Sequence, residues 1–218
     1  MRLACAGLLC LFLISCREIA PVQIPVTVTG YRIQGTVASV NGIPLKGAQV
    51  SLYYYLVLVD TTPSDTPNVI VPSEQSVIDI SVFTTKNQFI RHIALSTHPA
   101  PGILPHIFWD GRDQYGIPVP SGKYLIRYMV DSVIIKFSPV LIQGHPTAVT
   151  DDQGRFTITG DYLPVGAVFD FYLSDGSFDG VYEVQPSVDI GVQTQNTQTY
   201  YGPVDLVEND VTSVALTL

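Results

Sequence analysis

The chain has 218 residues, with 11 Lys and Arg against 19 Asp and Glu, and a formal net charge of −8. An acidic chain of this kind offers no basic surface to phosphates, so we expect no nucleic-acid partner. Hydrophobic residues make up 46% of the chain and charged residues 14%, which is enough apolar material for a packed core.

Residues 1–15 have the character of an export signal. Arg2 supplies a positive charge, and residues 3–14 form an apolar run that is too short to span a bilayer. The run ends in Leu13-Ile14-Ser15-Cys16, which resembles the lipobox of bacterial lipoproteins. This resemblance implies cleavage before Cys16 and acylation of its thiol. An ordinary secretory signal would end in an Ala-x-Ala-like site, which is absent, and a spanning anchor would need about 20 apolar residues.

Cleavage at this position would leave a chain that starts at Cys16. Residues 16–30 carry few charges and read as an extended tether. Arg17 follows the cysteine, whereas Asp at that position retains lipoproteins in the inner membrane of some bacteria. We therefore expect an exported protein, lipid-anchored to the bacterial cell envelope, at the outer membrane rather than the inner one. Several acyl chains would make the attachment stable.

Charge is distributed unevenly along the chain. Residues 146–218 carry eleven acids and one base, whereas residues 69–143 carry five acids and six bases. The acidic third could attract cations or a basic partner, or it could serve solubility alone.

The composition predicts an all-β fold. Sixteen prolines and seventeen glycines punctuate the chain at short intervals, and residues that favour strands are abundant. Alternation predicts strands over residues 31–37 and 49–59. Between them, Asn41-Gly42 is a strong hairpin signal, because both residues tolerate positive φ.

Two sequence blocks resemble one family. Gly35–Leu52, GTVASVNGIPLKGAQVSL, resembles the opening of carboxypeptidase regulatory-like domains, which are prealbumin-like β-sandwiches related to the B-type repeats of collagen adhesins. The second block of that family, a Thr-Asp-x-x-Gly-x-Phe element followed by a Leu-Pro-x-Gly turn, corresponds to Thr150–Gly166. It begins about 100 residues after the first block, so the resemblance implies an insertion.

The inserted part has a signature of its own. Phe108–Val130, FWDGRDQYGIPVPSGKYLIRYMV, resembles the immunoglobulin-like domain of the flagellar hook-capping protein FlgD. We therefore predict two β-sandwich modules, one nested in the other. The host comprises residues 31–58 and 146–218, and the insert comprises residues 69–143. Insertion into an exposed loop is tolerated when the loop ends lie close together.

Trp109-Asp110-Gly111-Arg112-Asp113 could be interpreted as a sugar or metal site, because it combines an aromatic ring with two carboxylates. A structural role fits better: the Trp109 ring would fill a core, Asp110-Gly111 would turn the chain, and Asp113 would accept hydrogen bonds from backbone N–H groups.

Calcium is the one cofactor that the sequence suggests. Asp175, Ser177 and Asp179 place oxygens at positions 1, 3 and 5 of a calcium-type loop, with Gly180 at position 6. Pro186 occupies position 12, where a bidentate Glu is required. A hairpin turn is the favoured interpretation of this segment.

Four tyrosines are candidates for a binding surface: Tyr53, Tyr55, Tyr200 and Tyr201. Exposed tyrosines could contact a glycan or a protein, and alternation would turn one or two of them outward. Packing within the sandwich is the alternative.

No catalytic motif stands out. The four histidines form no His-x-x-x-His or Glu-x-x-His pair, and a zinc site built on His98 and His106 would need a third ligand. We expect a protein that is not an enzyme and that serves as a scaffold, adhesion or protein-interaction module at the cell envelope. The alternative is a carbohydrate-binding accessory lipoprotein, assisted by calcium. A hydrolase subunit with an unrecognised site is a third hypothesis.

Overall fold

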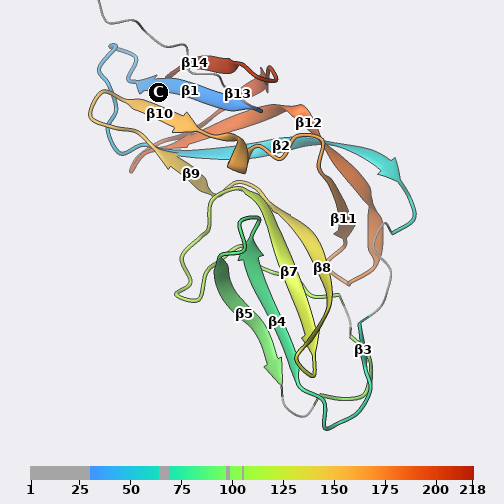
Figure 1. Ribbon diagram of the computed structural model, residues 1–218. Helices are drawn as coiled ribbons and strands as arrows, with labels where there is room; N and C mark the ends of the chain where they lie inside the picture. Colours follow the sequence, from blue (N-terminus) through green and yellow to red (C-terminus); the bar gives the residue numbers. More distant parts are fainter. Residues whose placement is uncertain (1–29, 64–68, 97–98, 105) are drawn as a thin grey trace, which may run out of the picture.

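The structure is a computed structural model that describes residues 30–63, 69–96, 99–104 and 106–218 (Figure 1). It confirms the all-β prediction, because the described residues form fourteen strands and one short 3₁₀ helix, η1 (Gly160–Tyr162). The strands build β-sandwich modules around two separate clusters of buried side chains. Residues 30–60 and 146–218 are called the host module below, and residues 69–143 the inserted module.

The host module contains two sheets. In the three-stranded sheet, β1 (Arg32–Ala38) pairs antiparallel with β10 (Arg155–Ile158) and parallel with β14 (Val211–Thr217). The five-stranded sheet is built on the long strands β2 and β12, which pair with each other. Its strands are β2 (Gln49–Asp60), β9 (Pro146–Val149), β11 (Val168–Tyr172), β12 (Phe178–Gln193) and β13 (Gln198–Asp205).

Alternation of side chains explains the host core. On β12, Val188, Ile190 and Val192 are fully buried, and the residues between them point to the other face. Leu52 on β2 and Ile33 on β1 reach the same core from the two sheets and are also fully buried. Burying a side chain of this size contributes about 1.5–3 kcal/mol.

The inserted module has one principal sheet, with the strand order β5-β4-β7-β8. On β7 every second side chain is buried, from Gly122 to Val130. These side chains pack with Ile80 and Val82 of β4 and with Trp109 from an irregular segment. The strands of this module are β3 (Ile70–Val71), β4 (Ile78–Thr84), β5 (Phe89–Ser96), β6 (Gly102–Ile103), β7 (Gly122–Val130) and β8 (Val133–Ile142).

Several contacts join the modules, among them three that involve charged or aromatic side chains. The Lys86 ammonium, in the β4–β5 turn, lies 2.6 Å from the Asp161 carboxylate of η1. The His106 ring stacks on the Tyr172 ring with centroids 3.7 Å apart. The Lys123 ammonium lies 5.9 Å from the centroid of the Phe169 ring. The modules therefore pack through charged and aromatic side chains at their boundary.

The predicted hairpin at Asn41-Gly42 is confirmed as a short local pairing, because Ala38 forms an antiparallel bridge with Pro44 across the turn. The turn itself forms: the Gly42 N–H donates to the Ser39 carbonyl, and Gly42 has φ +77°. The strands on either side of it belong to different sheets, because β1 pairs with β10 and β14 instead of β2. Gly47, with φ +75°, turns the chain a second time before β2 begins.

The described chain enters the fold beside the turn between β13 and β14. The Gly30 N–H donates to Asn209 Oδ1, and the Asn209 N–H donates to the Gly30 carbonyl. In Figure 1, β13 and β14 lie at the top of the molecule and β4 and β5 lie at the bottom. The entry point and the inserted module are therefore at opposite ends.

Candidate functional site

Three of the four candidate tyrosines gather on the outer face of the five-stranded sheet. Tyr53 of β2 is paired with Asp189 of β12, and Tyr200 of β13 is paired with Gly191 of the same strand. Asp189 and Gly191 alternate with the buried valines and isoleucine of β12, so these partners point away from the core. Tyr55, two residues after Tyr53, points to the same side. Tyr200 is 56% exposed and Tyr55 is 41% exposed.

Close packing orients these rings. The Tyr53 and Tyr200 rings meet edge to face, with centroids 5.4 Å apart at an angle of 67°. They lie over Gly191, where a Cβ would be 3.0 Å from Tyr53 Cε2. The Tyr55 hydroxyl donates to Asp189 Oδ1 at 2.9 Å, and Gln198 Nε2 donates to the Tyr200 hydroxyl at 2.7 Å. We call Tyr53, Tyr55, Tyr200 and Asp189 the tyrosine face.

The pKa values of Tyr53 and Tyr55 are raised above the ordinary value of 10.0, so both hydroxyls are neutral at physiological pH. Burial, together with the neighbouring Tyr200, raises the pKa of Tyr53 to about 12. The hydrogen bond to Asp189 raises the pKa of Tyr55 above its ordinary value. Their rings therefore keep an apolar, electron-rich surface next to the side chain of Asp189.

Tyr201 does not belong to the tyrosine face. It is paired with the buried Ile190, and its side chain packs against the host core. Its hydroxyl donates to the Thr217 carbonyl of β14, which joins the two host sheets. Of the four candidate tyrosines, the structure brings three together and places the fourth on the opposite side of the sheet.

The calcium candidates lie in and beside the turn that links β11 to β12. Asp175 Oδ1 accepts hydrogen bonds from the backbone N–H of Ser177 at 2.9 Å and from its hydroxyl at 2.6 Å. Asp179 Oδ2 accepts from the Tyr182 hydroxyl at 3.0 Å. The two hydrogen bonds from Ser177 lower the pKa of Asp175 and stabilise a hairpin turn. In the part of the chain that the structure describes, no three or more His, Cys, Asp or Glu residues are grouped so that they could hold a metal ion.

The structural interpretation of the Trp109 motif is confirmed. The Trp109 ring lies in the core of the inserted module, and its Nε1–H donates to the Arg112 carbonyl at 2.9 Å. Asp113 Oδ1 accepts from the backbone N–H groups of Tyr115 at 2.8 Å and Ile117 at 2.9 Å. Gly111 has φ +70°, which turns the chain after Asp110.

Sequence reasoning missed a polar cluster on the inserted module. Register brings Asp79 and Ser81 of β4 beside His92 of β5, with Arg127 of β7 adjacent. Both Ser81 Oγ and Asp79 Oδ1 lie next to His92 Nδ1, at 2.9 and 3.1 Å. In a catalytic triad the serine and the aspartate contact different ring nitrogens of the histidine, whereas here both contact His92 Nδ1. Ser81 is also fully buried, so this cluster does not have the geometry of a nucleophilic serine.

This cluster stabilises a charge on the sheet. Partial burial alone would raise the pKa of Asp79, but the Ser81 hydroxyl, His92 and Arg127 together lower it. The Arg127 guanidinium lies 4.5 Å from the centroid of the Phe83 ring. The alternation of β4 places Asp79 and Ser81 on one face, but only the pairing with β5 and β7 reveals the cluster.

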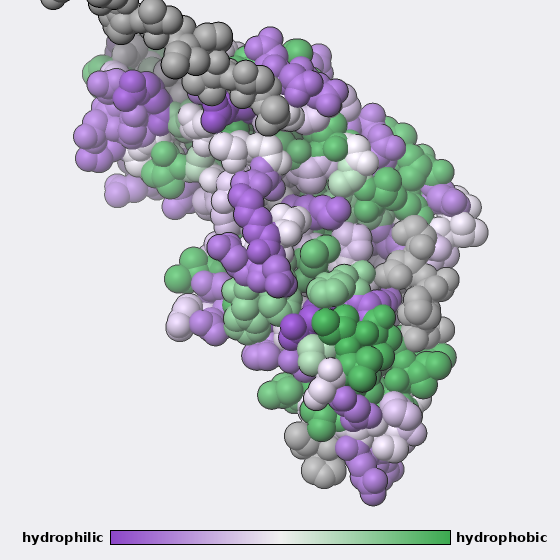
Figure 2. All heavy atoms as spheres, in the orientation of Figure 1, coloured by the Kyte–Doolittle hydropathy of each residue, from purple (hydrophilic) through white to green (hydrophobic). Residues whose placement is uncertain are grey.

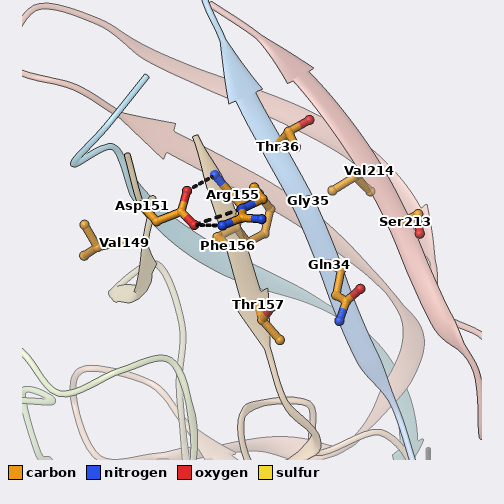
Figure 3. Close-up of a pocket in the computed structure, with 10 residues that line it drawn as sticks. All are labelled: Gln34, Gly35, Thr36, Val149, Asp151, Arg155, Phe156, Thr157, Ser213 and Val214. Carbon is orange, nitrogen blue, oxygen red and sulfur yellow. Dashed lines mark hydrogen bonds and ion pairs between the residues drawn. The ribbon is translucent and has the colours of Figure 1, made fainter. Parts of the chain in front are cut away.

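A second surface is the open trough shown in Figure 3, of about 610 Å³. It is lined by hydroxyl and amide side chains of the three-stranded sheet, among them Gln34, Thr36 and Thr157. The Asp151 carboxylate at its edge lies 2.9 Å from the Arg155 guanidinium. The trough is polar and shallow, and its one cation is already paired.

Two sequence predictions fall where the structure does not test them. Cys16 and the rest of the signal and tether up to residue 29 lie outside the described residues, as does His98. Within the described ranges, no helix is both long and apolar enough to cross a membrane. The His106 ring stacks on Tyr172 and meets Phe108 edge to face, and burial lowers its pKa.

Comparison of the chain with protein-family models, curated proteins and solved structures gave no match. The class of the protein therefore has to be argued from its fold and surface.

Proposed function

We propose that the chain is a non-catalytic lipoprotein of the bacterial cell envelope, anchored through Cys16, that binds a partner with its tyrosine face. In this proposal the host is a carboxypeptidase regulatory-like domain and the inserted module is FlgD-like. The outer membrane is the expected location, because Arg17 follows the cysteine. The role is that of a scaffold or adhesion module.

The observation that carries the proposal is the exposure of tyrosine rings on a sheet that already has a complete core. Tyr200 is 56% exposed although β12 buries its inward side chains fully and the inward side chains of β13, Tyr201 and Val204, pack against the same core. Tyrosine offers large contact area with few rotatable bonds, which is why it is frequent among residues that dominate binding energy. A face of this kind is better suited to binding a partner than to catalysis.

The position of the chain entry is consistent with this role. The described chain begins beside the β13–β14 turn, and the inserted module extends from the other end of the host. A tether at this end would leave the inserted module farthest from the membrane.

The binding proposal is tested by affinity capture from envelope extracts with the full chain in a non-ionic detergent. The double variant Tyr55→Ala/Tyr200→Ala should lose a partner that the wild type retains. Tyr115→Ala is the matched control, since Tyr115 is 78% exposed on the inserted module. Loss of the same partner with Tyr115→Ala, or its retention by the double variant, would exclude the tyrosine face as the binding surface.

The anchoring proposal needs a separate measurement. Cells that express the wild type or Cys16→Ser are labelled with a tagged fatty acid and fractionated. The wild type should carry the label and sediment with membranes, and Cys16→Ser should carry none. Label on the variant, or an unlabelled wild type, would contradict lipidation at Cys16.

Carbohydrate binding is the second candidate. It is favoured by the combination of the Tyr200 ring with hydrogen-bonding groups from Gln198 and Asp189. Retention on immobilised envelope polysaccharide that is lost with Tyr200→Ala would support it. Addition of a chelator would show whether calcium contributes.

A further inference from the structure

The five-stranded sheet of the host carries a one-sided charge. Its strands contain six carboxylates and no Lys, Arg or His: Asp60, Asp170, Asp179, Glu183, Asp189 and Asp205. The described bases of the host lie on β1, β10 and the loop before β2. The strands that present the tyrosine face therefore contribute acidic side chains and no basic ones.

Register places three of these carboxylates on the same face as the tyrosines. Asp189 is paired with Tyr53, and Glu183 is paired with the exposed Val57. Asp205 is paired with Ser187, which lies on the outward side of β12. These carboxylates border the tyrosine face along its length, from β13 to the end of β2.

The chemistry of this surface favours a cation. A tyrosine ring attracts an ammonium or guanidinium group over its face, and the attraction is about 0.5–1 kcal/mol at an exposed site. Asp189 accepts a hydrogen bond from Tyr55 and keeps a second oxygen, Oδ2, for a donor from outside. Anionic ligands would meet repulsion from three carboxylates without a compensating base.

We infer that the tyrosine face docks a Lys- or Arg-rich segment of a partner protein, whose cationic side chains lie over Tyr200 and Tyr53 and pair with Asp189 and Asp205. This inference rests on the proposed function, because it names the partner of the same face. Exposed apolar residues such as Val57, 49% exposed, would contact the aliphatic stems of those side chains.

The test uses the full chain in non-ionic detergent and a fluorescent octalysine peptide, with its fully acetylated form and an octaglutamate peptide as probes. Octalysine should bind, and its affinity should fall as salt is raised, because the pairs are exposed. The acetylated and acidic peptides should not bind. Equal binding of acetylated octalysine would overturn the inference.

Variants locate the binding. Tyr200→Ala and Asp189→Asn should each weaken octalysine binding about two- to fivefold. Asp152→Asn removes the same charge from the β9–β10 turn, where Asp152 is 79% exposed and paired with Lys46. It should change the affinity less than about twofold. A loss with Asp152→Asn as large as that with Asp189→Asn would reduce the effect to net charge and overturn the site.

The two proposals fail in different ways. If Tyr55→Ala/Tyr200→Ala loses its envelope partner while octalysine never binds, the tyrosine face is a binding surface and the cationic inference is wrong. If octalysine binds but the double variant keeps every envelope partner and still binds the peptide, both proposals are wrong for this face.

Discussion

Host and inserted modules contain the same turn in different surroundings. Asp151 in the host and Asp113 in the insert each accept hydrogen bonds from the backbone N–H groups two and four residues later. Each turn has a glycine three residues after the aspartate, Gly154 with φ +70° and Gly116 with φ +79°. One local solution to chain reversal therefore serves two modules.

The modules differ in how they cover their cores. The host closes its core between two sheets, so both layers are strands. The insert has a four-stranded sheet and the short two-stranded β3–β6 sheet, and Val71 of β3 and Trp109 from an irregular segment pack in its core. The smaller second sheet of the insert therefore leaves more of its core to side chains from irregular segments.

Substitutions that create a cavity should destabilise the two cores separately. Ile190→Ala in the host and Ile80→Ala in the insert each remove buried methyl groups from a different cluster, and each should lower the free energy of unfolding by about 2–5 kcal/mol. Hydrogen exchange followed by mass spectrometry should show faster exchange in the altered module first. Equal acceleration in both modules for either variant would indicate one cooperative unit.

In the three-stranded host sheet, side chains pack directly against the backbone of Gly35. A Cβ at Gly35 would lie 2.4 Å from Phe156 Cζ and 2.6 Å from Val214 Cγ2. Gly35→Ala should therefore lower stability by about 1–3 kcal/mol in a urea titration. Phe156→Leu in the same chain should recover part of the loss by vacating the ring position. A urea midpoint for Gly35→Ala equal to that of the wild type would argue against this packing.

The shared turn should matter more in the insert. Asp113 is half-buried and Asp151 is exposed, so Asp113→Ala should lower the free energy of unfolding by about 1–2 kcal/mol and Asp151→Ala should lower it by less. Asn at either position retains the accepting oxygen and should lose less. Thermal unfolding of the four variants checks this order, and a larger loss at Asp151 would reverse the comparison.

Adjacent tyrosines should separate stability from binding. Tyr201→Phe removes the hydroxyl that bonds to the Thr217 carbonyl and should lower stability by about 0.5–1.5 kcal/mol without affecting partner capture. Tyr200→Phe changes an exposed residue and should alter stability by less than about 0.5 kcal/mol. A stability loss at Tyr200 equal to that at Tyr201 would mean that both rings support the fold.

Acidification should give the smallest effect. The backbone N–H of Arg155 and then that of Gln153 hold the pKa of Asp151 below its ordinary value of 3.8. A carboxylate with a lowered pKa stabilises the fold above the unfolded-state pKa, and that contribution is lost as the pH falls through the folded-state value. Urea midpoints of wild type and Asp151→Asn should therefore converge between pH 7 and pH 3. A constant difference would exclude this contribution.

Local sequence patterns were sufficient to predict several strands and turns. The alternation that predicted strands over residues 31–37 and 49–59 corresponds to β1 and β2 within one residue at either end. The aspartate and glycine pattern of the Trp109 motif predicted its turn correctly. These features depend on neighbours a few residues apart, so a single sequence contains the information.

The candidate site could be predicted only in part. Alternation indicated that some of the four tyrosines face outward, but the pairing of β13 with β12 decided that Tyr200 joins Tyr53 while Tyr201 turns inward. A shift of register by one residue would exchange the two. Gly191 lies beneath the Tyr53 and Tyr200 rings, and it could not be recognised as part of the site before this pairing was known.

By itself, the sequence determined the all-β class, the acidic balance of the last third and the turn chemistry, because composition and period-two alternation act locally. Tertiary structure decided which strands are neighbours: it separated β1 from β2, placed β14 parallel to β1, and assembled Asp79, His92 and Arg127 from three strands. Strand pairing depends on contacts between residues far apart in the chain, and no local pattern encodes them.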